Sequence, residues 1–129
     1  MDSRSDPGTR HAPLTDRILL TAPAGPHGSG VVSLVLGGLG ARLDLPVDRV
    51  DELALAATTM AGSVDSDRLE LEVEVREDRV TVRVGPLEDD SSLDPGRRRI
   101  IERLVDGLAT IRHDGQEWAE LELRRGAGV

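Results

Sequence analysis

Apolar and polar residues alternate strictly in two neighbouring stretches in the middle of the chain. Residues 69–76 alternate Leu or Val with Glu or Arg, and residues 80–84 alternate Val with Thr or Arg. Successive side chains of a strand point to opposite faces, so this period of two predicts two strands that each bury one face. The polar pair Glu77-Asp78 between them predicts a tight antiparallel hairpin.

Three segments carry apolar residues at helical spacing, which predicts three amphipathic helices. These segments are residues 29–43, 46–62 and 95–108. Pro46 and Pro95 suit the start of a helix, because proline lacks the N–H group that the first turn leaves unpaired. Gly37, Gly38 and Gly40 weaken the first helix, and we expect them to allow close packing against a neighbouring element.

Three shorter apolar segments complete the predicted strands. They are residues 17–22, and residues 110–113 and 117–123 on either side of the turn Asp114-Gly115. The order β-α-α-β-β-α-β-β predicts an α/β (α+β) two-layer sandwich, with a mixed, largely antiparallel sheet and helices on one face. We expect residues 1–16 to be a disordered tail, residues 17–125 to form one domain, and residues 126–129 to be a short tail.

Composition and charge narrow the possible functions. There is no cysteine, and the three histidines are scattered, so neither a thiolate site nor a histidine-ligand spacing is present. The formal net charge of -8 repels phosphate backbones and favours a basic partner, and Trp118, the only aromatic residue, cannot form a base-stacking platform. No apolar stretch has the length of a signal peptide or a membrane span. We therefore expect a cytoplasmic protein that binds neither nucleic acid nor membranes.

The element order and two short phrases of sequence resemble a known family. The phrases are VDELALA at residues 50–56 and RLVDGL at residues 103–108. Over residues 17–125 the chain is similar to the RsbW-type anti-sigma regulatory factors, which have the histidine-kinase-like ATPase (GHKL) fold. The resemblance implies a dimeric regulator of transcription. Such a regulator holds a sigma factor inactive and phosphorylates a serine of an anti-anti-sigma protein, using ATP and magnesium.

Four positions that serve ATP in that family are substituted in this chain. The resemblance places the family's glutamate, which handles the attacking hydroxyl, at Thr59, and its magnesium-binding asparagine at Ser63. It places the aspartate that accepts the adenine amino proton at Pro86, and only Gly96 remains of a glycine pair before the third helix. Threonine is no base at neutral pH, serine is a weaker magnesium ligand than the amide, and a proline side chain accepts no hydrogen bond. We therefore expect no catalytic residue, no metal and no cofactor.

Two functions and one broader interpretation stay open. The first is a regulator that binds a sigma factor or an anti-anti-sigma partner, as a monomer or a homodimer, without kinase activity. The alternative is an ATP- and magnesium-dependent serine/threonine kinase that phosphorylates an anti-anti-sigma factor. The third interpretation takes the resemblance as one of fold alone, with the chain an interaction domain of another pathway.

Two groups of residues are candidates for partner contact. Arg97, Arg98 and Arg99 oppose the dipole of the predicted third helix, so an anionic or acidic partner would stabilise them. The alternative is that the acidic residues between 88 and 94 neutralise them. Trp118 falls on the outward side of its strand, where a large ring suits a partner or dimer contact. Its alternative role is to cover aliphatic side chains at the edge of the sheet.

Overall fold

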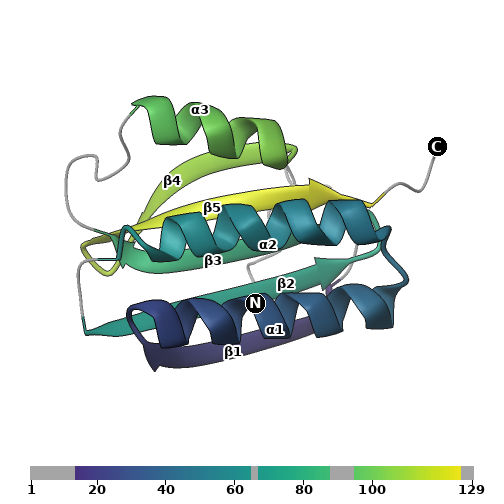
Figure 1. Ribbon diagram of the computed structural model, residues 1–129, viewed down its shortest axis with the longest axis horizontal. Helices are drawn as coiled ribbons and strands as arrows, with labels where there is room; N and C mark the ends of the chain where they lie inside the picture. The colour runs from purple at the N-terminus through teal and green to yellow at the C-terminus, as the bar shows by residue number, and fades with distance from the viewer. Residues whose placement is uncertain (1–13, 65–66, 88–94, 126–129) are drawn as a thin grey trace, which may run out of the picture.

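A computed structural model describes residues 14–64, 67–87 and 95–125. These residues form two layers, a five-stranded sheet and three helices that cover one of its faces (Figure 1). The predicted element order is confirmed: β1 (Leu14–Pro23), α1 (Pro26–Leu43), α2 (Val47–Ala61), β2 (Arg68–Arg76), β3 (Arg79–Leu87), α3 (Pro95–Leu104), β4 (Gly107–His113) and β5 (Gln116–Arg124). The strand β1 begins at Leu14, so the folded part starts before the predicted boundary at Arg17.

The strands lie in the order β1-β2-β3-β5-β4, which makes β3 the central strand. All four pairs of described strands are antiparallel, including the two predicted hairpins around Glu77-Asp78 and Asp114-Gly115. Asp114 and Gly115 both have positive φ, 55° and 76°. Two consecutive residues with positive φ match the right-handed twist of the strands they join, which is why Asp-Gly favours such a hairpin turn.

The core lies between the helices and the inner face of the sheet. The Leu and Val side chains of the alternating strands β2 and β3 are buried there, together with Leu36 of α1, Met60 of α2 and Ile101 of α3. Burial of each such side chain contributes about 1.5–3 kcal/mol. The same alternation places the charged residues of these strands on the face that the helices do not cover.

The third helix is shorter than its apolar spacing predicted. It ends at Leu104, and Leu108 lies in β4, where it pairs with Leu121 of β5. The physical reason is a backbone hydrogen bond of 2.9 Å from the Asp106 N–H to the Glu122 carbonyl, which draws the chain into the sheet. Ile100, one of the apolar residues at helical spacing in this segment, is 59% exposed, so it does not face the core as that spacing predicts.

Of the three glycines that weaken the predicted helix, Gly37, Gly38 and Gly40, only Gly40 lies in close contact with a neighbouring element. A Cβ atom on Gly40 would collide with the side chain of Val50 in α2, whereas nothing lies within 4 Å of that position on Gly37 or Gly38. Gly37 and Gly38 are exposed, so the expectation of close packing was wrong for them. The contact between α1 and α2 therefore depends on the missing side chain of Gly40.

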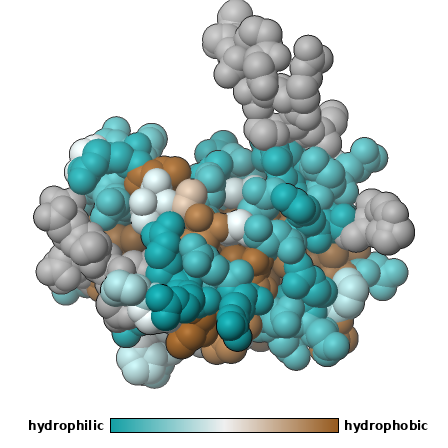
Figure 2. Space-filling model, turned by 90° about the horizontal axis from the view of Figure 1, so that it is seen from above, coloured by the Kyte–Doolittle hydropathy of each residue, from teal (hydrophilic) through white to brown (hydrophobic). Residues whose placement is uncertain are grey.

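The outside of the fold is mainly polar. From the side on which α3 and β4 lie, hydrophilic side chains cover most of the surface, and hydrophobic ones show as smaller patches between them (Figure 2). None of the described helices combines the length and the hydropathy needed to cross a bilayer.

Candidate functional site

The positions assigned to a nucleotide site lie around the end of α2 and the start of α3. The Thr59 hydroxyl donates a 2.7 Å hydrogen bond to the carbonyl of Leu55 in the same helix. The Ser63 hydroxyl accepts a 2.8 Å hydrogen bond from the guanidinium of Arg97, in the first turn of α3. The structure thus brings Ser63 and Arg97 together, and both hydroxyl groups have a partner within the protein.

Pro86 and Gly96 belong to the same end of the molecule, where α2 and β3 end and α3 begins (Figure 1). Pro86 follows a cis peptide bond after Gly85. The next residue, Leu87, forms an isolated bridge with Val64, which ties the end of β3 to the chain just after Ser63. Across the described ranges, no group of three or more His, Asp or Glu side chains could hold a metal ion.

The arginines of α3 have different surroundings. Arg97 is bonded to Ser63, and the Nε atom of Arg98 lies 3.3 Å from the carboxylate of Glu102, one helical turn further on. Arg99 is exposed. The acidic residues between 88 and 94, predicted to neutralise these arginines, lie outside the described residues.

Trp118 lies on the face of the sheet that the helices do not cover, opposite the buried Ala119 and Leu121, as the alternation of β5 predicted. Its ring packs on Gly85 of β3. A Cβ atom on Gly85 would be 2.7–3.1 Å from the Trp118 atoms Cδ2, Cε3 and Cγ. These three neighbouring ring atoms are at similar distances, so the ring lies face-on over the glycine. The α3 arginines and Trp118 therefore belong to two separate surfaces.

The indole N–H group of Trp118 is buried and has no hydrogen-bond partner in the part of the chain that the structure describes. An unpaired buried donor costs about 1–3 kcal/mol. Among the described residues, the ring is thus held by its packing on Gly85 and not by a hydrogen bond.

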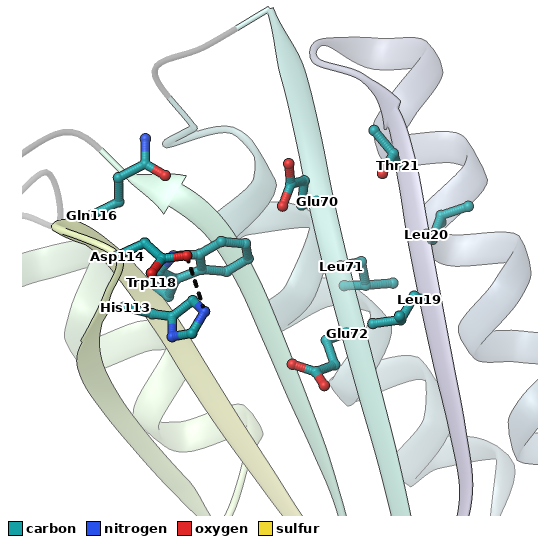
Figure 3. Close-up of a pocket in the computed structure, with 10 residues that line it drawn as sticks. All are labelled: Leu19, Leu20, Thr21, Glu70, Leu71, Glu72, His113, Asp114, Gln116 and Trp118. Carbon is teal, nitrogen blue, oxygen red and sulfur yellow. Dashed lines mark ion pairs between the residues drawn. The ribbon is translucent and has the colours of Figure 1, made fainter.

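Trp118 borders a hollow of about 460 Å³ on the uncovered face of the sheet (Figure 3). One wall consists of outward residues of β1 and β2, and the other consists of the tip of the β4–β5 hairpin. The first wall carries Leu19, Thr21, Glu70 and Glu72, and the second carries His113, Asp114 and Gln116. Two further hollows, of about 290 and 180 Å³, continue from it along the same face.

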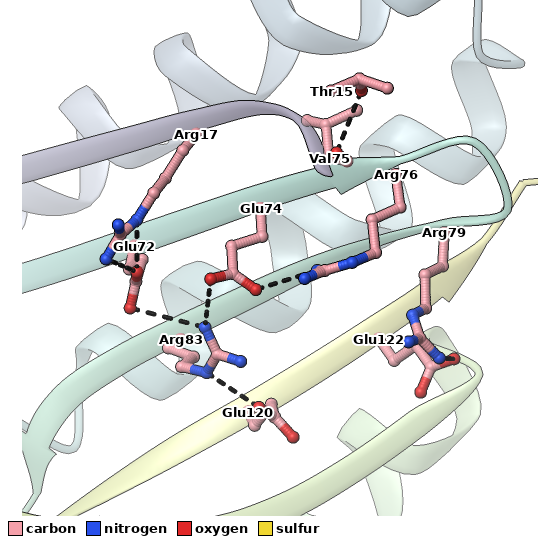
Figure 4. Close-up of polar contacts among 10 residues, drawn as sticks. All are labelled: Thr15, Arg17, Glu72, Glu74, Val75, Arg76, Arg79, Arg83, Glu120 and Glu122. Carbon is pink, nitrogen blue, oxygen red and sulfur yellow. Dashed lines mark hydrogen bonds and ion pairs between the residues drawn. The ribbon is translucent and has the colours of Figure 1, made fainter. Parts of the chain in front are cut away.

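Beyond the hollow, the same face carries a network of arginine and glutamate side chains (Figure 4). Its centre is Arg83 of β3, whose guanidinium lies 2.8 Å from the carboxylate of Glu120, 3.3 Å from that of Glu74 and 3.5 Å from that of Glu72. Burial raises the pKa of the Glu74 carboxyl, but a hydrogen bond from Arg76 and the charge of Arg83 outweigh burial, so that this pKa lies below its ordinary value. Burial lowers the pKa of Arg83, and the charges of Glu74 and Glu120 raise it further than burial lowers it.

The sequence pattern points to Trp118 but to no other residue of this face as a candidate for partner contact. The available signal was the outward half of the strand alternation, which contains Glu70, Glu72, Glu74 and Arg83. By itself this alternation predicts only that these residues lie on the unburied side of their strands.

No protein family and no curated protein matches this chain. Two places in the structure bear on its function. One is the Ser63–Arg97 contact on the helix side of the sheet, and the other is the hollow beside Trp118 on the opposite side.

Proposed function

We propose that this chain regulates transcription by binding another protein, a sigma factor or an anti-anti-sigma factor, without phosphorylating it. The observation that carries the proposal is the 2.8 Å hydrogen bond between Arg97 and Ser63. In the family that the sequence resembles, the position of Ser63 holds magnesium. A guanidinium beside that position repels a metal cation, and the Thr59 hydroxyl, bonded to its own helix, is no base.

Two features support a function in binding. The two-layer fold has the element order of the regulators that the sequence resembles. A large face of the sheet is uncovered and carries a partly buried tryptophan beside a hollow, and aromatic residues in such places often contribute most to protein contacts. Arg97, Arg98, Arg99 and Trp118 remain the residues that we expect at partner contacts, in a cytoplasmic protein acting as a monomer or homodimer.

Titration with ATP and magnesium tests the proposal against the kinase alternative. We expect no saturable heat of binding and no change in Trp118 fluorescence up to about 1 mM ATP, which corresponds to roughly 4 kcal/mol of binding free energy. An active kinase of the resembled family serves as the positive control. Saturable binding, followed by phosphorylation of an anti-anti-sigma serine, would overturn the proposal.

The variant Arg97→Gln sharpens this test, because it removes the positive charge next to Ser63 and keeps a side chain that can donate a hydrogen bond. We expect it to bind no nucleotide either, since the positions at Thr59 and Pro86 remain substituted. Magnesium-dependent binding that appears only in Arg97→Gln would show that one side chain blocks an otherwise working nucleotide site.

Binding to purified sigma factors and anti-anti-sigma proteins from the same genome tests the positive half of the proposal. We expect one of them to form a stoichiometric complex that survives size-exclusion chromatography without ATP. The proposal fails if none of these proteins binds.

A further inference from the structure

Glu70 stands on one wall of the hollow, and no described residue forms an ion pair with it. Its side chain is exposed on β2, across the hollow from Trp118 (Figure 3), and its carboxylate has no ion pair or hydrogen bond to the described residues. On the opposite wall, Asp114 lies 3.4 Å from His113, which is a counter-charge only when the histidine is protonated. None of the described side chains lining the hollow is an arginine or a lysine. The hollow therefore attracts a cation.

Glu72 adds a third carboxylate to this hollow, although it is already shared. It lies 2.6 Å from the guanidinium of Arg17 and 3.5 Å from that of Arg83. Arg17 is the nearer partner of Glu72, and Arg83 is shared with Glu74 and Glu120. Among the described residues of the hollow, Glu70 and Asp114 are therefore the carboxylates that no arginine pairs with.

The indole ring supplies the hollow with an aromatic surface. One ring face covers Gly85, and the other is turned toward the hollow that Trp118 lines. The negative face of a tryptophan ring attracts cations placed over it. A guanidinium suits this surrounding better than an ammonium, because it is planar, stacks on rings and pairs with carboxylates through its forked N–H groups.

We propose that this hollow binds an arginine side chain of a partner protein, with the guanidinium over Trp118 and paired with Glu70. This inference rests on the proposed function, in that the chain acts by binding a protein, but not on which protein it binds. The formal net charge of -8 disfavours a nucleic acid as the occupant and favours a basic protein segment.

The shape of the surface indicates an extended segment and not a free small cation. The second hollow shares Glu72, His113 and Trp118 with the first, and the third shares Glu74 and Arg83 with the second. The three together form a trough across the sheet. The arginine and glutamate side chains along it can pair with polar groups of a segment whose arginine occupies the first hollow.

The single tryptophan allows a direct test, because its indole N–H gives one resonance in a ¹H–¹⁵N spectrum. The full chain is titrated with a blocked Gly-Arg-Gly tripeptide and, separately, with the same peptide carrying citrulline, which has the shape of arginine without its charge. We expect a saturable shift of the indole resonance with the arginine peptide alone, weakened by added salt. Equal shifts with both peptides, or no saturable shift with arginine up to about 20 mM, would overturn the proposal.

Two variants that remove the same charge at different places show whether the affinity for the arginine peptide depends on the hollow or on net charge alone. We expect Glu70→Gln to weaken binding of the arginine peptide about two- to fivefold, which is the effect of losing an exposed charge pair. Glu77→Gln, at the exposed turn at the other end of β2, should leave the affinity unchanged. Equal losses in the two variants would mean that net charge alone is responsible.

The failure of this inference is distinguishable from the failure of the proposed function. If a sigma factor or an anti-anti-sigma protein binds and Glu70→Gln leaves its affinity unchanged, the hollow is not the contact and only this inference falls. If the arginine peptide binds and no such protein does, the hollow stands and the proposed function falls. A concentration-dependent shift of the indole resonance without any peptide would assign this face to a second copy of the chain and overturn the inference.

Discussion

Replacing Gly85 with alanine places a methyl group where the ring of Trp118 now lies. The added Cβ would be 2.7 Å from Cδ2, 2.8 Å from Cε3 and 3.1 Å from Cγ of the ring. Gly85 is paired with Glu70 of β2, and β3 is also held to β5 on either side of it, at Val84 and Leu87, which limits how far the strand can retreat. The ring therefore has to tilt outward into the hollow.

The expected loss of stability follows from two effects of opposite sign. Glycine loses more conformational freedom on folding than alanine, so the substitution by itself stabilises a strand by roughly 0.5–1 kcal/mol. Overpacking costs typically about 1–3 kcal/mol. The ring of Trp118 is only partly buried and can yield, so we expect a net decrease in the free energy of unfolding of roughly 1 kcal/mol.

Urea unfolding followed by circular dichroism measures this decrease, and the emission maximum of Trp118 reports on the ring. We expect Gly85→Ala to be less stable with an unchanged m value, to emit at longer wavelength, and to bind the arginine peptide more weakly. In a Trp118→Leu background the clash is absent, so the same substitution should be neutral or stabilising. If Gly85→Ala is as stable as the original protein and its emission is unchanged, the ring does not lie over Gly85 and the reasoning is wrong.

Two further predictions concern the helix contact and the charged face. Gly40→Ala should destabilise the fold by up to about 2 kcal/mol, because the added Cβ meets Val50. Gly38→Ala, at an open position of the same helix, should stabilise the fold by about 1 kcal/mol. Thermal unfolding compares the two variants, and equal Tm values would refute the contact between Gly40 and Val50. Because the pKa of Glu74 is lowered in the folded state, its stabilising contribution is fully present above the ordinary glutamate pKa of about 4.3 and is lost as pH falls through the lower folded value. The difference in unfolding free energy between the original protein and Glu74→Gln should therefore be largest near pH 7 and shrink below about pH 4, and a difference that stays constant with pH would contradict this.

The strands were predictable because their signals are local. A strict alternation of apolar and charged residues matches the period of a strand and not that of a helix. Asp114-Gly115 supplies the two positive φ angles that a tight hairpin needs. The end of α3 was not predictable from such a signal. Leu108 is correctly spaced to continue the helix, and what decides its place is the hydrogen bond between Asp106 and Glu122 of β5, residues far apart in the sequence.

The candidate site could be predicted only in part for a related reason. The outward position of Trp118 follows from the alternation of β5, but the hollow depends on how two walls from different strand pairs face each other. A glycine within a strand often marks a place where another group approaches closely, so Gly85 was the local signal that a ring lies above β3. The sequence alone does not identify the ring that lies above Gly85. The pairing of β3 with β5 identifies it as that of Trp118.

The two candidate places lie at the same end of the sheet but on opposite sides of it, and β3 passes between them. Gly85 lies under Trp118, and Leu87 is tied to Val64, next to Ser63. Coupling between two sites needs an element with two discrete arrangements, and a central strand paired on both sides is poorly suited to move between two. A partner bound at the hollow would therefore leave the Ser63–Arg97 contact unchanged. The proposed function is accordingly one in which the chain covers a surface of its partner, without relaying a signal through the sheet.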